Sequence, residues 1–340
     1  MAEFLRRPRW TPELIHTGQH SSPEMSDQFF CDLEIPHPNV HLGLSGGTPT
    51  YQTAQILLKL EPVLAQVLPD LLLVVGDVTS TLAAALAAVR NGIRVAHVEA
   101  GLRSFDRSMP EEINRVVTDH LSDFLFTTEP SGERNLRAEG IDPSRIFFVG
   151  NVMIDTLLRF RAKAAQSGVL QELGLEAGNY AVVTLHRPAN VDDPGRLAAL
   201  LAMLQEVATR IPVVFPVHPR TQKQLEEQKV STDGLVLCPP KGYLDFLRLM
   251  SEARLVLTDS GGIQEETTIL QVPCLTMRTN TERPVTIDQG SNCLVGIEPE
   301  AILSAALQEL ANARLASPKT PELWDGNASG RICDILEAKL

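Results

Sequence analysis

The sequence has few features of secreted, membrane or metal-binding proteins. No apolar run approaches the ~20 residues of a transmembrane helix, and no apolar segment follows the charges of MAEFLRRPRW as it would in a secretory signal. No C-x-x-C pair is present to indicate a zinc or redox site. We therefore expect a cytoplasmic protein. Its cysteines are expected to be reduced core residues: Cys31, Cys238, Cys274, Cys293 and Cys333.

Several catalytic motifs are missing as well. The chain has no G-x-S-x-G nucleophile elbow, no P-loop and no G-x-G-x-x-G, which argues against hydrolase, NTPase and NAD-dependent functions. No histidine spacing resembles a metal cage. A net charge of -12 argues against nucleic acid as a partner, because binding its phosphates leaves a basic footprint. General acid/base chemistry on a phosphorylated small molecule remains, since local cations and backbone amides can bind a phosphate in an acidic protein.

The pattern of apolar runs predicts two α/β domains. The length of 340 residues has room for two cores. Short apolar runs alternate with helical patterns from about residue 70, and the pattern restarts near residue 180 with five more strands. The runs are apolar at successive positions, as in parallel strands covered on both faces. We expect Rossmann-like domains at 1–160 and 161–320, a linker within 155–178, and a ligand in a central cleft between the two facing sheets.

Polar side chains follow the predicted strands. A single acid in this position often caps the next helix, and that interpretation applies to Asp77 taken alone. Five such residues together predict a site at the carboxyl ends of the strands. They are Asp77, Glu99, His186, His218 and Asp259.

The stretch LVLTDSGGIQEE, 255–266, passes from a strand into a helix. Ser260, Gly261 and Gly262 lie where free backbone amides and the helix dipole favour a diphosphate. Glu265 and Glu266 come one turn later, where a carboxylate could accept hydrogen bonds from sugar hydroxyls. The alternative is a tight turn followed by a solvated pair of acids.

A second acidic cluster lies in HVEAGLRSFDRSMPEEINR, 97–115. Pro110 is expected at the start of a helix, with Glu111 and Glu112 in the first turn and Arg115 one turn later. Glu111 and Arg115 could form an ordinary surface pair. The acids could instead form a protonatable pair in which one carboxyl is neutral and one ionised.

Seven blocks of the sequence resemble the UDP-N-acetylglucosamine 2-epimerases of the non-hydrolysing type. They occur in the family's order over nearly the whole chain. The blocks are TGQH, GDVTST, HVEAGLRSFDRSMPEEINR, VGNVMIDTL, TLHRPANVDD, TDSGGIQEE and TERPVTIDQGSNCLVG. The resemblance implies a fold of the GT-B type, in which a C-terminal helix at 321–340 packs back on the first domain. It also implies a homodimer that binds UDP-N-acetylglucosamine and UDP without a cofactor or a metal.

The resemblance further implies a reaction and the residues that perform it. UDP-N-acetylglucosamine and UDP-N-acetylmannosamine interconvert by elimination and re-addition of UDP through 2-acetamidoglucal. The residues matching the family's catalytic positions are Asp77, Glu99, Glu111 and His186. Those matching its substrate-binding positions are Arg115, His218, Phe246, Ser260, Gly261, Gly262, Glu266 and Arg283. Gln19 and His20 match an activator site for a second nucleotide sugar.

The sequence departs from the family at its beginning. Family members open with a strand and a Gly-Thr-Arg-Pro-Glu loop, and this chain starts with MAEFLRRPRW. We therefore expect Met1 to be an internal methionine, and the first sheet to lack a central strand and to have unpaired edges. Three alternatives stay open: a hydrolysing epimerase that releases N-acetylmannosamine, a catalytically silent nucleotide-sugar-binding protein, and an epimerase of a diacetamido-uronate sugar.

Overall fold

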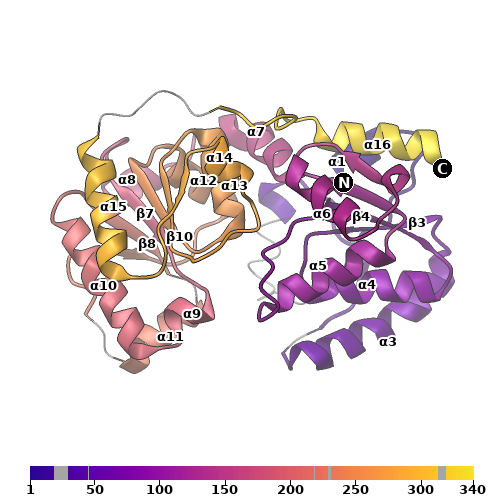
Figure 1. Cartoon of the computed structure of the whole chain (residues 1–340), viewed down its shortest axis with the longest axis horizontal. Coiled ribbons are helices and arrows are strands. Elements are labelled where there is room, and N and C mark those ends of the chain that lie inside the picture. The colour runs from indigo at the N-terminus through magenta and orange to yellow at the C-terminus, as the bar shows by residue number, and fades with distance from the viewer. Residues whose placement is uncertain (19–29, 45, 218, 229–230, 313–318) are drawn as a thin grey trace. The chain divides into compact units, whose positions relative to one another are not determined.

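The chain forms two compact α/β units in a computed structural model (Figure 1). The structure describes residues 1–18, 30–44, 46–217, 219–228, 231–312 and 319–340. The first unit comprises Met1–Asp155 and Glu322–Leu340, and the second comprises Thr156–Pro321. Helix α7 (Val152–Ala164) contains the boundary, so the expected linker region is helical at its start.

Six strands and six helices of the described residues belong to the first unit. The strands are β1 (Ile15–His16), β2 (Val40–His41), β3 (Leu71–Val75), β4 (Arg94–Ala100), β5 (Phe124–Thr127) and β6 (Ile146–Phe148). The helices are α1 (Ala2–Arg6), α3 (Pro49–Val67), α4 (Thr79–Arg90), α5 (Pro110–Leu121), α6 (Pro130–Ala138) and α16 (Ala328–Lys339), and a 3-10 helix covers Pro143–Arg145. All pairings are parallel.

The strands of the first unit form two separate sheets. One sheet has the order β3-β4-β5-β6, and β1 and β2 form the other. A cavity of about 950 Å³ is lined by residues of both sheets, including Ile15 of β1 and all of β3 (Leu71–Val75), and by apolar residues of α3. Val75 at the end of β3 is 47% exposed although it is apolar. Strand β3 therefore presents an unpaired edge to this cavity.

The C-terminal segment completes the core of the first unit. Ile332 and Leu336 of α16 pack with apolar residues of β4 and β5. Asp155 holds the start of this helix, because its carboxylate accepts hydrogen bonds from the main-chain nitrogens of Ala328 (3.0 Å) and Ser329 (2.7 Å). Such a bond satisfies amides that have no acceptor within the helix.

The second unit has a single six-stranded parallel sheet of order β12-β11-β10-β7-β8-β9. Its strands are β7 (Ala181–Thr184), β8 (Val213–Pro216), β9 (Val236–Cys238), β10 (Leu255–Thr258), β11 (Cys274–Thr276) and β12 (Asn292–Leu294). Its helices are α8 (Val169–Glu172), α9 (Pro188–Val191), α10 (Pro194–Ala208), α11 (Pro219–Gln228), α12 (Tyr243–Ser251), α13 (Gly261–Leu270), α14 (Val285–Asp288) and α15 (Pro299–Ala311). The expected five strands were one too few, because the three-residue β12 contains a polar residue and is too short to show a pattern.

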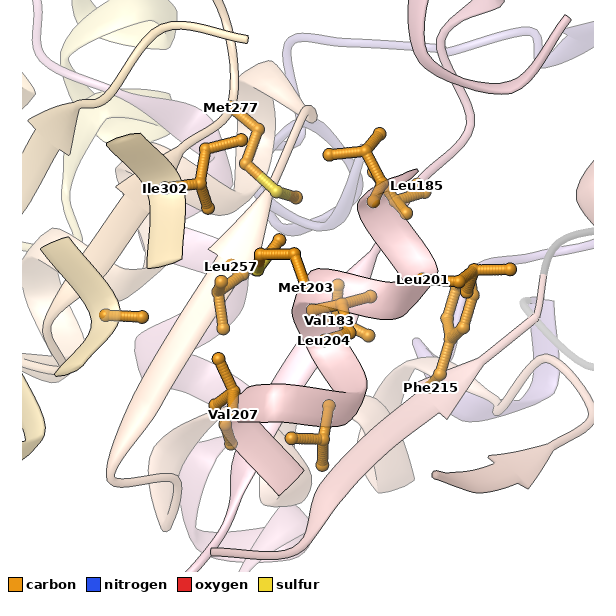
Figure 2. Packing of buried hydrophobic residues seen from close by; sticks show 14 of the residues in the cluster. Val183, Leu185, Leu201, Met203, Leu204, Val207, Phe215, Leu257, Met277 and Ile302 are labelled. Carbon is orange, nitrogen blue, oxygen red and sulfur yellow. The ribbon is translucent and has the colours of Figure 1, made fainter. Parts of the chain in front are cut away.

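Alternate residues of these strands contact different helical layers. Val183 and Leu257 face a cluster with α10 and α15 (Figure 2). Val182 and Val256, one position away, face a cluster with α8, α12 and α13. Because successive strand residues point to opposite faces, both faces of the sheet must be covered by helices. This is why the strands are apolar at successive positions.

The cysteine prediction is only partly confirmed. Cys238, Cys274 and Cys333 are buried, but Cys31 and Cys293 are exposed, and all five are free thiols. Cys293 lies on β12 at the edge of the sheet, where one side has no neighbouring strand. Among the described residues, no helix combines the length and the apolarity needed to cross a membrane.

Candidate active site

Glu99 is the inserted residue of a β-bulge. The register between β4 and β5 shifts between Val98 and Ala100, and the backbone of Glu99 has a left-handed φ of +73°. A bulge redirects a side chain, and a non-glycine residue holds this conformation only when its surroundings enforce it. The ideal Cβ position on Gly76 lies 3.6 Å from Oε2 of Glu99, so the carboxylate lies beside the turn that follows β3.

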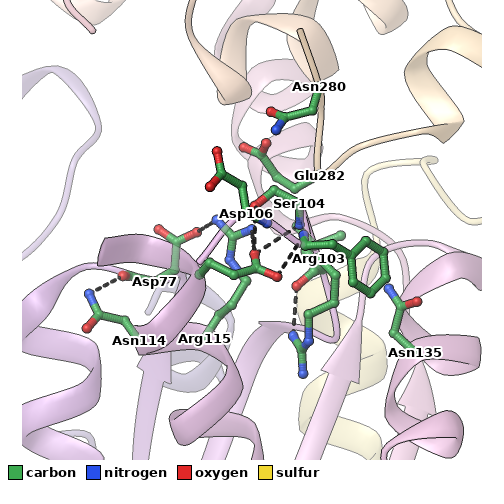
Figure 3. A network of polar contacts seen from close by, with 12 residues as sticks. Asp77, Arg103, Ser104, Asp106, Asn114, Arg115, Asn135, Asn280 and Glu282 are labelled. Atoms are coloured by element: carbon green, nitrogen blue, oxygen red, sulfur yellow. Dashed lines mark hydrogen bonds and ion pairs between the residues drawn. The ribbon is translucent and has the colours of Figure 1, made fainter. Parts of the chain in front are cut away.

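Asp77 lies in that turn and pairs with Arg115 of α5. Nη2 of Arg115 donates to Oδ2 of Asp77 at 2.6 Å, and Nδ2 of Asn114 donates to the main-chain oxygen of Asp77 at 2.8 Å (Figure 3). The Asp77 side chain is 22% exposed. The N-cap of α4 is Val78, so the interpretation of Asp77 as a helix cap is wrong. The aspartate is held by a buried cation and still reaches solvent.

Glu111 and Glu112 differ in their surroundings. Oε2 of Glu112 accepts from Nη1 of Arg115 at 2.9 Å, and the Glu112 carboxylate also accepts from the main-chain nitrogens of Ser104 and Phe105, each at 2.9 Å. Glu112 and Arg115 are 3% and 2% exposed, so the interpretation of Arg115 as part of an exposed surface pair is wrong. Glu111 is only half-buried in the first turn of α5.

In the second unit, His186 is held by Asp259. Nδ1 of His186 lies 2.7 Å from Oδ1 of Asp259. Asp259 follows β10, is fully buried, and accepts from the main-chain nitrogens of His186 (3.0 Å) and Arg187 (2.9 Å) and from Nδ2 of Asn190 (3.1 Å). Burial alone would raise the pKa of Asp259, but these donors hold it below its ordinary value. The His186 ring is thus fixed through Nδ1, which directs Nε2 away from the aspartate.

The guanidinium of Arg283 packs against the start of α13. Ser260 is its N-cap, and the first amides of a helix have no acceptor within the helix and favour an anion. A Cβ on Gly261 would overlap Nη1 of Arg283 and would lie 2.8 Å from Oε1 of Glu282. Arg283 pairs with Glu282, and its Nε lies 3.0 Å from Oε1 of Glu265. The glycine therefore lets a buried cation lie against the helix start.

Glu266 is a buried acid one turn into the same helix, past Gly262. Glu265 and Glu266 are 0% and 5% exposed, so the alternative of a solvated acid pair is wrong. The Tyr243 hydroxyl donates to Oε1 of Glu266 at 3.0 Å. Burial raises the pKa of Glu266 to about 7, and the hydrogen bond from Tyr243 opposes this rise. Phe246, on α12 with Tyr243, is half-buried.

Three of the predicted site residues lie outside the described residues: Gln19, His20 and His218. In the described part of the chain, no group of three or more His, Cys, Asp or Glu side chains could hold a metal ion. Two residues important for the observed geometry, Asp259 and Glu112, were recognised in the sequence as polar positions but not as positioning groups. Their partners are far apart in the chain or belong to a loop, and only the fold brings them together.

The two α/β units place carboxylates and a histidine at or next to strand ends and glycines at the start of a helix, an arrangement typical of α/β enzymes. A family model described as UDP-N-acetylglucosamine 2-epimerase matches residues 2–337. The chain therefore belongs to the UDP-N-acetylglucosamine 2-epimerase family and is an isomerase of the GT-B fold type.

Individual relatives cover nearly the whole chain. A UDP-N-acetylglucosamine 2-epimerase homolog of Methanococcus maripaludis is 44% identical over 95% of this chain and 91% of its own length. A UDP-2,3-diacetamido-2,3-dideoxy-D-glucuronate 2-epimerase of Pseudomonas aeruginosa is 40% identical over 96% of this chain and 91% of its own length. The crystal structure of Methanocaldococcus jannaschii UDP-GlcNAc 2-epimerase, in complex with UDP-GlcNAc and UDP, is 40% identical with a TM-score of 0.90. The match covers 99% of this chain and 95% of the chain in that structure.

Proposed function

We propose that this enzyme reversibly converts UDP-N-acetylglucosamine into UDP-N-acetylmannosamine. The names of several relatives support this substrate, and one of them was crystallised with UDP-GlcNAc and UDP. Elimination breaks the C2–H bond and the bond between C1 and the UDP oxygen, and it forms the C1=C2 double bond of 2-acetamidoglucal. Re-addition returns UDP to C1 and a proton to the opposite face of C2. No oxidant or reductant is needed.

The carboxyl groups of the first unit take the acid/base roles in this proposal. Asp77, Glu99 and Glu111 would remove the proton from C2 and deliver one to the other face, which requires carboxyl groups on both sides of the ring. Arg115 keeps Asp77 oriented through the 2.6 Å hydrogen bond. The buried contacts of Glu112 suit it to hold the loop rather than to exchange protons.

The second unit binds the nucleotide in this proposal. The amides of Gly261 and Gly262, with Ser260 and Arg283, would hold the diphosphate. Glu266 would accept from the ribose hydroxyls, and Phe246 would pack beside the uracil. His186, oriented by Asp259, would stabilise the departing UDP. His218 is included among the binding residues from the sequence alone.

One observation carries the proposal most directly. Asp77 and Glu99 come from the ends of adjacent strands. Glu99 is the bulge residue of β4, and its left-handed backbone directs its carboxylate toward Gly76, the residue before Asp77. Strain of this kind costs of order 1–3 kcal/mol and is typical of functional positions. Glycine would adopt this backbone conformation without strain, so a carboxylate kept here in spite of the strain is consistent with a functional role.

The reaction is tested by incubating the protein with UDP-N-acetylglucosamine in deuterated water. We expect deuterium at C2 and the appearance of UDP-N-acetylmannosamine, both followed by NMR. Free N-acetylmannosamine would indicate the hydrolysing alternative. Thermal stabilisation by UDP without exchange at C2 would indicate a silent binding protein. Substitution Glu99→Gln should abolish exchange but leave UDP affinity within a few-fold, and an exchange rate equal to that of the wild type would remove Glu99 from the acid/base set.

A second candidate substrate is UDP-2,3-diacetamido-2,3-dideoxy-D-glucuronate. The Pseudomonas aeruginosa relative named for this sugar is 40% identical over 96% of the chain, close to the identity of the relatives named for UDP-N-acetylglucosamine. Comparing kcat/KM for the two nucleotide sugars decides between them. The homodimer and the cytoplasmic location stay predictions, and light scattering of the purified protein tests the first.

A further inference from the structure

Both ring nitrogens of His97 face hydrogen-bond acceptors. Nδ1 lies 2.7 Å from Oδ1 of Asp119, and Nε2 lies 2.8 Å from the main-chain oxygen of Gly76. His97 and Asp119 are both 0% exposed. A neutral imidazole carries one N–H, so one of its nitrogens would present a lone pair to an oxygen at hydrogen-bond distance. Only the doubly protonated ring donates to both partners.

A chain of alternating charges continues from this pair. Oδ2 of Asp119 lies 2.7 Å from Nη1 of Arg103. Nε and Nη2 of Arg103 donate to the two carboxylate oxygens of Glu139, each at 2.7 Å. With a cationic His97, the four side chains contain two positive and two negative charges and are balanced in pairs. With a neutral His97, a net negative charge would remain in a cluster of which only Glu139 reaches solvent, and the burial of the other three side chains disfavours this charge.

We propose that His97 is permanently protonated and acts as a positioning residue. Together with Asp119 it holds in place the backbone segments that contain Asp77 and Glu99. The proposal rests on the function proposed above, because it concerns the geometry of that site. Neither residue is assigned a contact with substrate, so neither is a catalytic residue here.

The contacts reach the backbone beside both acids. The Gly76 carbonyl that accepts from His97 belongs to the peptide group joining Gly76 to Asp77. The main-chain nitrogen of Gly101, two residues after Glu99, donates to Oδ2 of Asp119 at 3.1 Å. One buried ion pair therefore spans the turn after β3 and the end of the bulged strand β4. Displacement of either segment would move a carboxyl group relative to the sugar.

The charged neighbours of His97 support its protonation. Burial by itself would lower the pKa of His97, but the Asp119 carboxylate, the Gly76 carbonyl and the Glu99 carboxylate together raise it above its ordinary value. Asp119 shows the reciprocal effect, since burial would raise its pKa while His97 and Arg103 lower it. These groups come from α5, from the turn after β3, from β4 itself and from the loop that follows it.

The protonation state is tested on the wild-type protein without substrate. Nitrogen-15 NMR of the histidine rings at pH 7.5, with His97 assigned through contacts to Gly76 and Asp119, should show protons on both nitrogens. An ordinary histidine is about nine-tenths neutral at that pH. A single protonated nitrogen on His97 at pH 7.5 would overturn the proposal, whether or not the protein has epimerase activity.

The positioning role is tested by Asp119→Asn. This variant keeps the size of the side chain but removes the charge, so we expect His97 to become neutral at pH 7.5. The kcat for C2 exchange should fall about a hundredfold, as for a misplacement of about 1 Å, with KM within about twofold. The loss should be partly reversed as the pH is lowered and His97 regains its proton. An unchanged kcat, or a loss that is equal at every pH, would contradict the positioning role.

His120→Gln is the matched control. His120 follows Asp119 in α5 and is exposed. Its Nδ1 lies 2.9 Å from the main-chain oxygen of Val116. This variant should keep the wild-type kcat, KM and pH profile. If the wild type shows no C2 exchange, the proposed function fails, and the NMR result on His97 still decides the protonation state.

Discussion

The guanidinium of Arg283 occupies the space that a side chain on Gly261 would need. Both residues are neighbours of the same helix start, and Arg283 is itself 6% exposed and paired with Glu282 and Glu265. Its neighbours are also buried, so it has little freedom to move away. A side chain at the first position of α13 would therefore displace the ends of the Arg283 and Glu282 side chains, in addition to any effect on a ligand.

Gly261→Ala should weaken UDP binding by about 10- to 100-fold, the range for a lost hydrogen bond to a charged group, because Arg283 must shift. Isothermal titration calorimetry with UDP measures this. Gly195→Ala is the control, since Gly195 lies in the first turn of α10 and an added Cβ would meet only Oδ1 of Asp193, at 3.4 Å. Equal UDP affinities for the wild type and Gly261→Ala would show that the position of Arg283 does not matter.

The buried acid Glu266 should make the stability depend on pH. Its folded-state pKa is raised from 4.5 to about 7, so the native protein holds a proton that the unfolded chain has lost. Stability is then highest below pH ~4.5 and falls by about 3 kcal/mol as the pH rises through 7. Urea unfolding at pH 5 and pH 8.5 should show this fall in the wild type and a smaller fall in Glu266→Gln.

Tyr243→Phe is a second check on the same group. The Tyr243 hydroxyl donates to Glu266 at 3.0 Å and thereby stabilises its ionised form. Without this donor, the pH at which stability falls should move upward. If the wild type and both variants share one pH profile, Glu266 does not titrate in this range.

Asp259→Asn should slow catalysis through His186 without removing the imidazole. The main-chain nitrogens of His186 and Arg187 donate to Oδ2 and should keep the amide oxygen on their side. The NH₂ group then replaces the acceptor at 2.7 Å from Nδ1, and we expect kcat to fall by about 10- to 100-fold. The pKa of Asp259 is lowered in the folded state. The ionised carboxylate therefore stabilises the folded protein at neutral pH, and this contribution is lost as the pH falls through the lowered pKa. The stability difference between wild type and variant should therefore stay constant from neutral pH down to about pH 4, the ordinary pKa of an aspartate, and shrink below it, as denaturant titrations can measure.

Glu111 and Glu112 offer a matched pair of substitutions. Glu111→Gln should abolish C2 exchange with stability within about 0.5 kcal/mol of the wild type, because Glu111 is half-buried and its proposed role is in acid/base catalysis. Glu112→Gln should cost about 1–3 kcal/mol, because its buried carboxylate accepts from Ser104, Phe105 and Arg115. Thermal unfolding and deuterium exchange separate the two effects. The opposite pattern would exchange the roles of the two acids.

The bulge at Glu99 predicts a conflict between stability and activity. Glycine adopts a φ of +73° without the cost that other residues bear. Glu99→Gly should therefore be about 1 kcal/mol more stable than Glu99→Gln, although both lack exchange activity. A less stable glycine variant would show that the backbone at Glu99 is not strained.

Much of the architecture could be read from the sequence because its physical causes are local. Runs such as AVVT and LVLT are apolar at successive positions, as expected where helices cover both faces of a parallel sheet. Pro110 marked the start of α5, as expected from its fixed φ and missing amide hydrogen. The strand β12 was missed because a segment of three residues, one of them polar, becomes a strand only by pairing with its neighbour β11.

The sequence alone determined which chemical groups are present at the strand ends and what they exclude. It placed one carboxylate after β3 and another near the end of β4, a histidine after β7 and glycines at the start of α13, and these positions depend only on chain order. The fold decided which carboxylate is held by an arginine and which is buried. Arg115 pairs with Asp77 across 38 positions and with Glu112 rather than Glu111, and His97 meets Asp119 across 22. Protonation and orientation depend on distances between segments and on exclusion of water, and both exist only after the chain has folded.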